Sequence, residues 1–226
     1  MHVTRVQGNT SGLQAVGLGS LEGNLPEGAL IVRNDSSEPV MTIVFKWTIP
    51  VEGNAARTQW LYVDGYYWPQ PQPVLSPGST ALVTVNGMLG EEDFGELVQN
   101  PMMFGSPLVN RFSEASVTEP GTVGTIDAVF FADGKIEGGD SSQYEKTIQT
   151  RHFMFQSLLS QLHELTSAAD VKERAALIAS QATNDTADSS TLIRRQTARE
   201  IERSSDPMAL LAGLKEHTIP AKFLPF

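Results

Sequence analysis

VGTIDAVFFADGKIEGGDSSQYEKTIQTR, residues 123–151, is the stretch in which the spacing of apolar residues changes from two to three or four. Its first part, Val123 to Phe131, alternates along the chain and ends with apolar groups on both faces, which predicts a strand buried on both sides. Asp133 and Gly134 follow, a dipeptide that tolerates the positive φ of a hairpin turn into a short return strand. The sequence before this stretch predicts sheet, and the sequence after it predicts helix.

A capping box marks the expected start of the first helix. In Ser142-Gln143-Tyr144-Glu145, the hydroxyl and the carboxylate can both accept hydrogen bonds from free backbone N–H groups. The apolar residues that follow are spaced by threes, fours and sevens and form one stripe: Tyr144, Ile148, Phe155, Leu158, Leu159, Leu162 and Leu165. Further helices are predicted over 171–183, over 191–204 and from Pro207, with caps at Ser167–Asp170 and at Asp206.

The region before residue 123 reads as short strands separated by turns. Strands are predicted over 29–33, 40–48, 60–63 and 80–85, and the alternation of 40–48 places Trp47 in the core. A weaker edge strand is predicted over 13–18, and a polar loop follows Pro50. Residues 86–119 read as a long insertion loop that contains a short helix at 92–99.

Charge is distributed unevenly along the 226 residues. The net charge is −10, and all of it lies in residues 1–140, which hold 6 basic and 16 acidic side chains. Nucleic-acid binding depends on basic patches, so we expect no nucleic-acid partner. No apolar run is long enough to cross a membrane, and the first residues lack the pattern of a signal peptide.

Several kinds of chemistry find no support in the sequence. The absence of cysteine excludes disulfides, thiolate nucleophiles and cysteine-bound metals. Neither a Gly-x-Ser-x-Gly elbow nor a phosphate-binding loop occurs. His152 and His163 lie about 16 Å apart on the predicted helix, too far for one metal, and Ser167 stands where a zinc helix needs its second histidine. We predict solvated helix histidines, and no cofactor.

Carboxylates gather around the glycine-rich turn that ends the predicted sheet. Asp133, Glu137 and Asp140 are candidate calcium ligands, because calcium takes oxygen ligands from loops. Their spacing does not fit an EF-hand, in which Lys135 and Tyr144 would occupy ligand positions. The favoured interpretation is that they stabilise the turn and the helix cap.

Aromatic side chains concentrate in one stretch of the β part. Tyr66, Tyr67 and Trp68, with Trp60 close by, are four of the seven Trp and Tyr residues, and three prolines follow at alternate positions. Exposed aromatic clusters stack on sugar rings or contact partner proteins, whereas buried ones fill the edge of a core. Of these two alternatives, filling the edge of the core is the favoured interpretation, and the four residues are the candidate binding site.

Arginines recur on the predicted third helix. Arg194, Arg195, Arg199 and Arg203 lie partly on one face, interrupted by Glu200 and Glu202. A solvated helix with internal ion pairs is the favoured interpretation. A binding patch for an acidic partner is the alternative.

The succession of short strands that ends in Val-Phe-Phe-Ala-Asp-Gly, residues 129–134, resembles an immunoglobulin-like β-sandwich. The disulfide pair and the tyrosine corner of that family are missing. Residues 126–134, continuing to Gly138-Gly139-Asp140, also resemble a stretch in uncharacterised bacterial hypothetical proteins, from which no activity can be transferred. The fold class predicted is α+β, with an antiparallel immunoglobulin-like sandwich over 1–137 and a module of three to four helices over 141–226.

The leading functional hypothesis is a non-enzymatic interaction or structural protein, located outside the cytoplasm, that binds a partner through its aromatic and proline-rich loop. A carbohydrate-binding module is the first alternative, because Trp60 and Trp68 could stack on sugars. An unrecognised hydrolase is the second, and it requires a cleft where Glu91, Glu92 or Asp133 converge. The oligomeric state does not follow from the sequence.

Overall fold

A computed structural model of the protein describes residues 3–6, 29–66, 71–85, 87–89, 121–180 and 189–224. The chain divides into two compact units. The β unit comprises Met1–Gly65 and Pro73–Ser142, and the helical unit comprises Tyr66–Gln72 and Gln143–Phe226. The sequence does not indicate that a segment inside the β part groups with the helices. The expected domain limits at 137 and 141 stay predictions.

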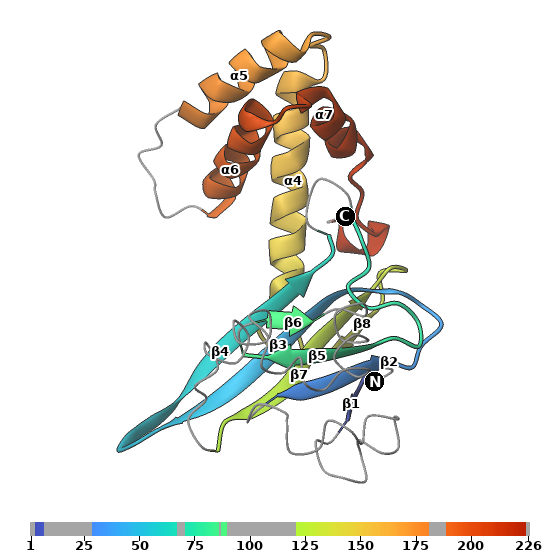
Figure 1. The fold of residues 1–226 in the computed structure, drawn as a ribbon, viewed down its shortest axis with the longest axis vertical. Helices are drawn as coiled ribbons and strands as arrows, with labels where there is room; N and C mark the ends of the chain where they lie inside the picture. The colour runs from blue at the N-terminus through green and yellow to red at the C-terminus, as the bar shows by residue number, and fades with distance from the viewer. Residues whose placement is uncertain are drawn as a thin grey trace, which may run out of the picture. The chain divides into compact units, whose positions relative to one another are not determined.

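Two antiparallel sheets make up the β unit (Figure 1). The first has the order β1-β2-β5-β6 and consists of β1 (Val3–Val6), β2 (Leu30–Asn34), β5 (Thr80–Thr84) and β6 (Gly87–Leu89). The second has the order β4-β3-β7-β8 and consists of β4 (Asn54–Asp64), β3 (Val40–Val51), β7 (Val123–Phe131) and β8 (Ile136–Gly138). Together with the helices described below, these sheets confirm the α+β class.

Side chains from both sheets form one core, as expected for a sandwich. Period-two alternation along β3 points Ile43, Phe45 and Trp47 into it, and all three side chains are fully buried. Trp47 pairs with Gly124 on β7, where an added Cβ would lie 2.8 Å from the indole Nε1. The close approach of the indole therefore requires glycine at this position. The other strands contribute Leu30, Val32, Ala81, Val83, Val129 and Phe131.

The β3–β4 hairpin is longer than predicted. β4 begins at Asn54, whereas the sequence predicts a loop there and a strand only from Trp60. The first residues of β4 are small or polar and exposed, so they carry no hydrophobic period. The strand pairs with β3 in one register from Asp64 to Arg57, and the register shifts before Asn54 pairs with Val51. Gly53, with φ of +70°, makes the tight turn. The predictions over 13–18 and 92–99 lie outside the described residues.

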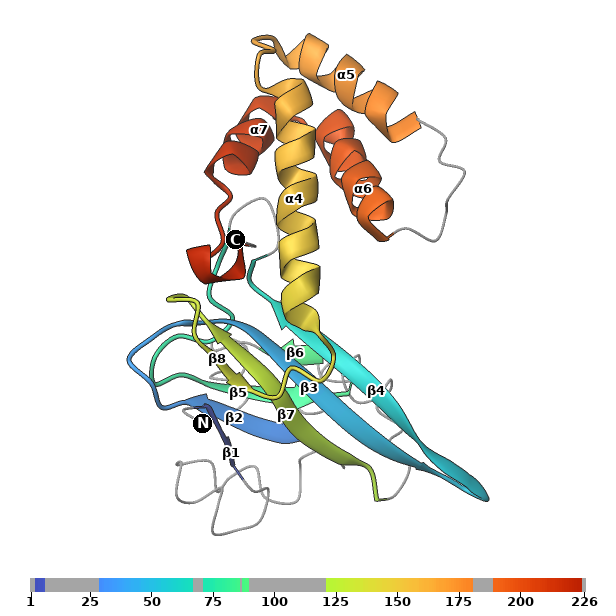
Figure 2. The same cartoon turned by 180° about the vertical axis from the view of Figure 1, so that it is seen from behind.

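In the described part of the helical unit, four helices and a 3-10 turn confirm the predicted helices (Figure 2). They are α4 (Tyr144–Leu162), α5 (Ala168–Ser180), α6 (Ser189–Arg203), α7 (Pro207–Glu216) and η3 (Ala221–Phe223). The predicted stripe of α4 packs into a core with the other helices, whose buried members include Phe155, Leu158, Leu162, Val171, Ile178, Ile201, Leu211 and Leu214. None of the described helices is long and apolar enough to cross a membrane.

The helix caps differ in how well the sequence predicts them. Asp206 accepts a hydrogen bond from the N–H of Ala209 at 2.9 Å, with Pro207 at the first helical position, as predicted. The capping box prediction is wrong, since the cap of α4 is Gln143, which has left-handed backbone angles and makes no side-chain cap bond. The hydroxyl of Ser142 donates instead to Asp140, because the chain enters the helix through a different turn.

Candidate functional site

The outer face of the β4-β3-β7-β8 sheet carries exposed aromatic rings. Along β4, Leu61 and Val63 pack against the core, so Trp60 and Tyr62 lie on the opposite face. Trp60 is half-buried, and Tyr62 is 40% exposed. The residues that flank Trp60 on this face are at least partly exposed, whereas Val44, the cross-strand partner of Tyr62, is buried. We name the exposed and half-buried set the Trp60 face: Lys46, Thr48, Thr58, Trp60, Tyr62, Val123 and Thr125.

A cation–π contact orders the centre of the Trp60 face. Lys46 pairs with Trp60 across the sheet, and its ammonium nitrogen lies 5.4 Å from the centroid of the indole ring. Such contacts contribute about 0.5–1 kcal/mol at exposed sites. The hydroxyl of Thr125 donates to the carbonyl oxygen of Lys46 at 3.2 Å and thereby joins the same patch. The contact therefore favours the observed orientation of the Trp60 ring.

Tyr62 was not among the residues that the sequence singled out, although its spacing of two from Trp60 on a strand was a usable signal. Burial raises the pKa of its phenol above the ordinary value of 10.0, and the Asp127 and Asp140 carboxylates add to the rise, while a hydrogen bond with Ser142 opposes it. The phenol is therefore neutral at physiological pH, and its ring is the part of Tyr62 that a partner would contact.

The structure separates the four aromatic residues of the predicted site. Tyr66 belongs to the helical unit, where it is 3% exposed and lies edge-on to Phe223 with ring centroids 6.0 Å apart. Its ring fills a core, which is the interpretation that the sequence favoured. Tyr67 and Trp68 lie outside the described residues. Trp60 is the member of the set that the structure places on an accessible sheet face.

The candidate calcium ligands each have a local role in the turn. Asp133 accepts from the N–H of Lys135 at 2.8 Å, and Glu137 accepts from the ammonium of Lys135 at 2.7 Å. Asp140 accepts from Ser142 at 3.3 Å. Within the described ranges, no three histidine, aspartate or glutamate side chains form a group that could hold a metal ion. Of the hydrolase candidates, Glu91 and Glu92 lie outside those ranges, and Asp133 is exposed on the hairpin turn.

A pair of histidines, one buried and one half-buried, lies in the helical unit, and the sequence did not reveal it. The rings of His152 on α4 and His217 after α7 have centroids 5.8 Å apart. His217 is 2% exposed, meets Phe155 edge-on at 4.7 Å and donates from Nε2 to the carbonyl oxygen of Tyr66 at 2.9 Å. His152 is half-buried rather than fully solvated, because helix packing brings it beside His217, which is far away in the chain. His163 is exposed, as predicted.

Acidification should destabilise the helical unit through His152. Burial lowers the pKa of this imidazole, and the neighbouring His217 lowers it further. The unfolded chain, with a histidine pKa of about 6.5, then binds more protons than the folded chain once the pH falls below that value. We expect the free energy of unfolding to fall between pH 7 and pH 5, as measured by urea titration of the helical circular dichroism signal.

Two variants test the assignment of this pH dependence. His152→Gln removes the titrating ring and should flatten the profile below pH 6.5. His163→Gln is the matched control, since it removes an exposed histidine from the turn after the same helix, and it should keep the wild-type profile. An unchanged slope in His152→Gln would show that another group is responsible.

Comparisons of the chain with protein families, with characterised proteins and with solved structures found no match. What the protein does must therefore be inferred from its own residues.

Proposed function

We propose that this chain is a non-enzymatic binding protein that recognises a partner protein with the Trp60 face of its β unit. The observation that carries the proposal is the presence of two aromatic side chains, Trp60 and Tyr62, side by side on the exposed face of a strand at the edge of its sheet. Aromatic residues on such faces are enriched among those that contribute most to protein interfaces. The proposal keeps the expectation that aromatic side chains bind the partner, but it assigns this role to the Trp60 face of the sheet rather than to the loop after Tyr66.

The proposal includes an immunoglobulin-like fold for the β unit. Its strand orders match the immunoglobulin scheme if β1, β2 and β5 are strands A, B and E, and β4, β3, β7 and β8 are C′, C, F and G. The buried Trp47 on β3 then occupies strand C, where that family carries a core tryptophan. One departure is that β6 lies at the position of strand D but follows strand E in sequence. The support is therefore topological, and it transfers no activity.

An extended segment of the partner is the occupant that fits this surface. β4 runs for 11 residues and ends its sheet in the described part of the chain. A peptide that pairs with an edge strand gains backbone hydrogen bonds, and every second side chain then lies on one face. At β4 these side chains would continue the row that contains Trp60 and Tyr62. The partner strand would thus be selected by apolar or aromatic residues at alternate positions.

Site-directed photo-crosslinking in cells that produce the protein tests this function. A p-benzoylphenylalanine in place of Tyr62 should give an adduct with one discrete protein, and mass spectrometry should locate the adduct in one extended segment. The same probe in place of Phe153, which is similarly exposed at 43% but lies on α4, should not give that adduct. Identical adducts at both positions, or none at Tyr62, would contradict the proposal.

Loss of the aromatic rings should weaken binding of the segment recovered by crosslinking. We expect Trp60→Ala to raise the dissociation constant tenfold or more, because central aromatic residues dominate interface energies. Calorimetry with the synthetic segment measures the effect. Phe153→Ala removes an exposed ring from the helical unit and should leave the affinity unchanged. Equal affinities of the wild type and Trp60→Ala for the segment would show that the Trp60 face is not the binding site.

A glycan is the second candidate ligand, because rings two residues apart on a strand are about 6.8 Å apart and suit stacking on sugars. The position of the Lys46 ammonium over the Trp60 ring disfavours this candidate, since a sugar would have to displace it. Titration with a glycan panel while following tryptophan fluorescence separates the two. A saturable shift that disappears in Trp60→Ala would favour the glycan.

A further inference from the structure

The arginines of α6 occupy three different environments. Arg195 donates from Nε to the carbonyl oxygen of Ala179 at 3.2 Å and so satisfies an acceptor in the last turn of α5. Arg194 is half-buried, and its Nε has no hydrogen-bond partner in the described part of the chain. Arg199 and Arg203 are exposed. The first two side chains are thus engaged in packing, and the last two remain available to a ligand.

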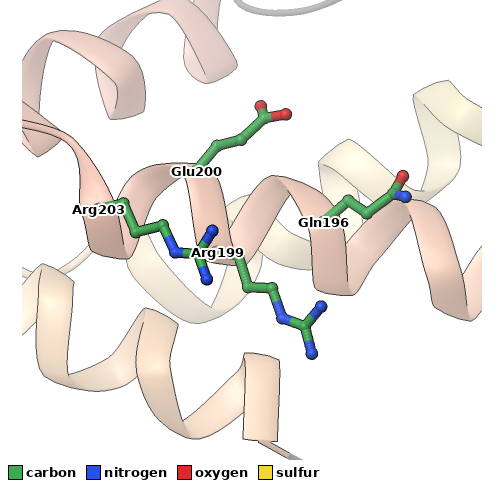
Figure 3. A pocket seen from close by; sticks show the side chains of 4 residues that line it. All are labelled: Gln196, Arg199, Glu200 and Arg203. Atoms are coloured by element: carbon green, nitrogen blue, oxygen red, sulfur yellow. The ribbon is translucent and has the colours of Figure 1, made fainter.

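Arg199 and Arg203 line a cavity of about 360 Å³ together with Gln196 and Glu200 (Figure 3). The four residues come from successive turns of one face of α6. Figure 3 shows the Glu200 carboxylate pointing away from the two guanidinium groups. The side chains that line this open cavity end in two cations, one amide and one carboxylate, and their aliphatic stems form the rest of its wall. A charged group suits it better than an apolar ligand.

The spacing of the two arginines is unfavourable without an anion. Residues four apart on a helix are neighbours, and like charges at this spacing destabilise the helix. Neither Arg199 nor Arg203 forms an ion pair with another residue that the structure describes. Arg203 lies in the last turn of α6, where the helix dipole favours a cation, but Arg199 lies a turn earlier. The dipole therefore does not account for the pair.

We propose that Arg199 and Arg203 bind the carboxylate groups of an acidic polypeptide segment. A planar guanidinium presents two parallel N–H donors that match the two oxygens of a carboxylate. Glu200 reduces the formal charge of the lining residues to +1, which fits singly charged carboxylates better than a phosphate dianion. The cavity has room for one or two side chains. This site is independent of the Trp60 face and of the partner proposed for it.

Fluorescence anisotropy of a labelled hexaglutamate peptide tests the proposal on the full chain. The protein carries a net charge of −10, so overall electrostatic repulsion opposes association with this anionic peptide and leaves a local basic site as the source of any binding. We expect saturable binding at low ionic strength that weakens as salt is added. A hexaglutamine peptide should not bind, and inorganic phosphate should compete only weakly.

Matched variants locate the binding on α6. The double variant Arg199→Gln, Arg203→Gln should weaken hexaglutamate binding at least tenfold. Arg174→Gln, which removes an exposed arginine from α5, should bind like the wild type. Circular dichroism checks that all variants keep their helices. The proposal is overturned by absent saturable binding, by equal binding of the double variant, or by phosphate binding more tightly than the peptide.

Discussion

Replacing Trp47 with alanine should lower the free energy of unfolding of the β unit by about 3–5 kcal/mol. Trp47 lies on the inner strand β3 and is 0% exposed, and the centroid of its ring is 5.6 Å from the centroid of the Phe45 ring. Backbone pairing with both β4 and β7 restrains β3, so the sheet cannot collapse onto the space left by the ring. Hydrogen–deuterium exchange of peptides from β3 and β7 in increasing urea measures the change in this unit.

Trp60→Ala is the control for this prediction, because it removes the same side chain from a half-buried site on the neighbouring strand. Its loss of stability should be smaller, since part of the ring already contacts water. If Trp47→Ala cost less than Trp60→Ala, the indole would not be the centre of the sandwich core.

Gly138→Ala should destabilise the β unit by about 3 kcal/mol or more through strain and a lost strand pair. Gly138 has a backbone φ of +100°, a conformation that residues other than glycine rarely adopt. An added Cβ would lie 2.2 Å from the carbonyl oxygen of Asp127, so the backbone of β7 or β8 would have to move. That movement would disturb the hydrogen bond from the N–H of Gly139 to the same oxygen. Exchange protection of β7 and β8 peptides reports the loss.

The adjacent glycine provides a matched comparison. A Cβ added at Gly139 would meet nothing within 4 Å, and this residue is not among those with positive φ. Gly139→Ala should therefore leave the stability unchanged or raise it slightly, because alanine restricts the unfolded chain. If the two variants lost similar amounts of stability, the glycines would be needed for the flexibility of the turn and not for the close approach at Gly138.

Candidate residues could be predicted from the sequence where their environment depends on neighbours along the strand. Trp60 is such a case, since alternation in β4 places it opposite Leu61 and outside the core. Tyr66 follows only four residues after Tyr62, yet it lies in the core of the helical unit beside Phe223. Contact with a residue near the other end of the chain leaves no periodic signal. The same holds for His152, whose burial depends on His217.

By itself, the sequence determined the α+β class and the order of the longer strands and helices, because hydrophobic period and turn dipeptides act over a few residues. The buried run of β7, the Asp133-Gly134 turn and the stripe of α4 are read in this way. The tertiary structure alone decided strand order, the length of the polar hairpin, the place of Tyr66 and the His152–His217 pair. These depend on which distant surfaces exclude water together, and the free energy of that burial is shared among residues that no local pattern connects.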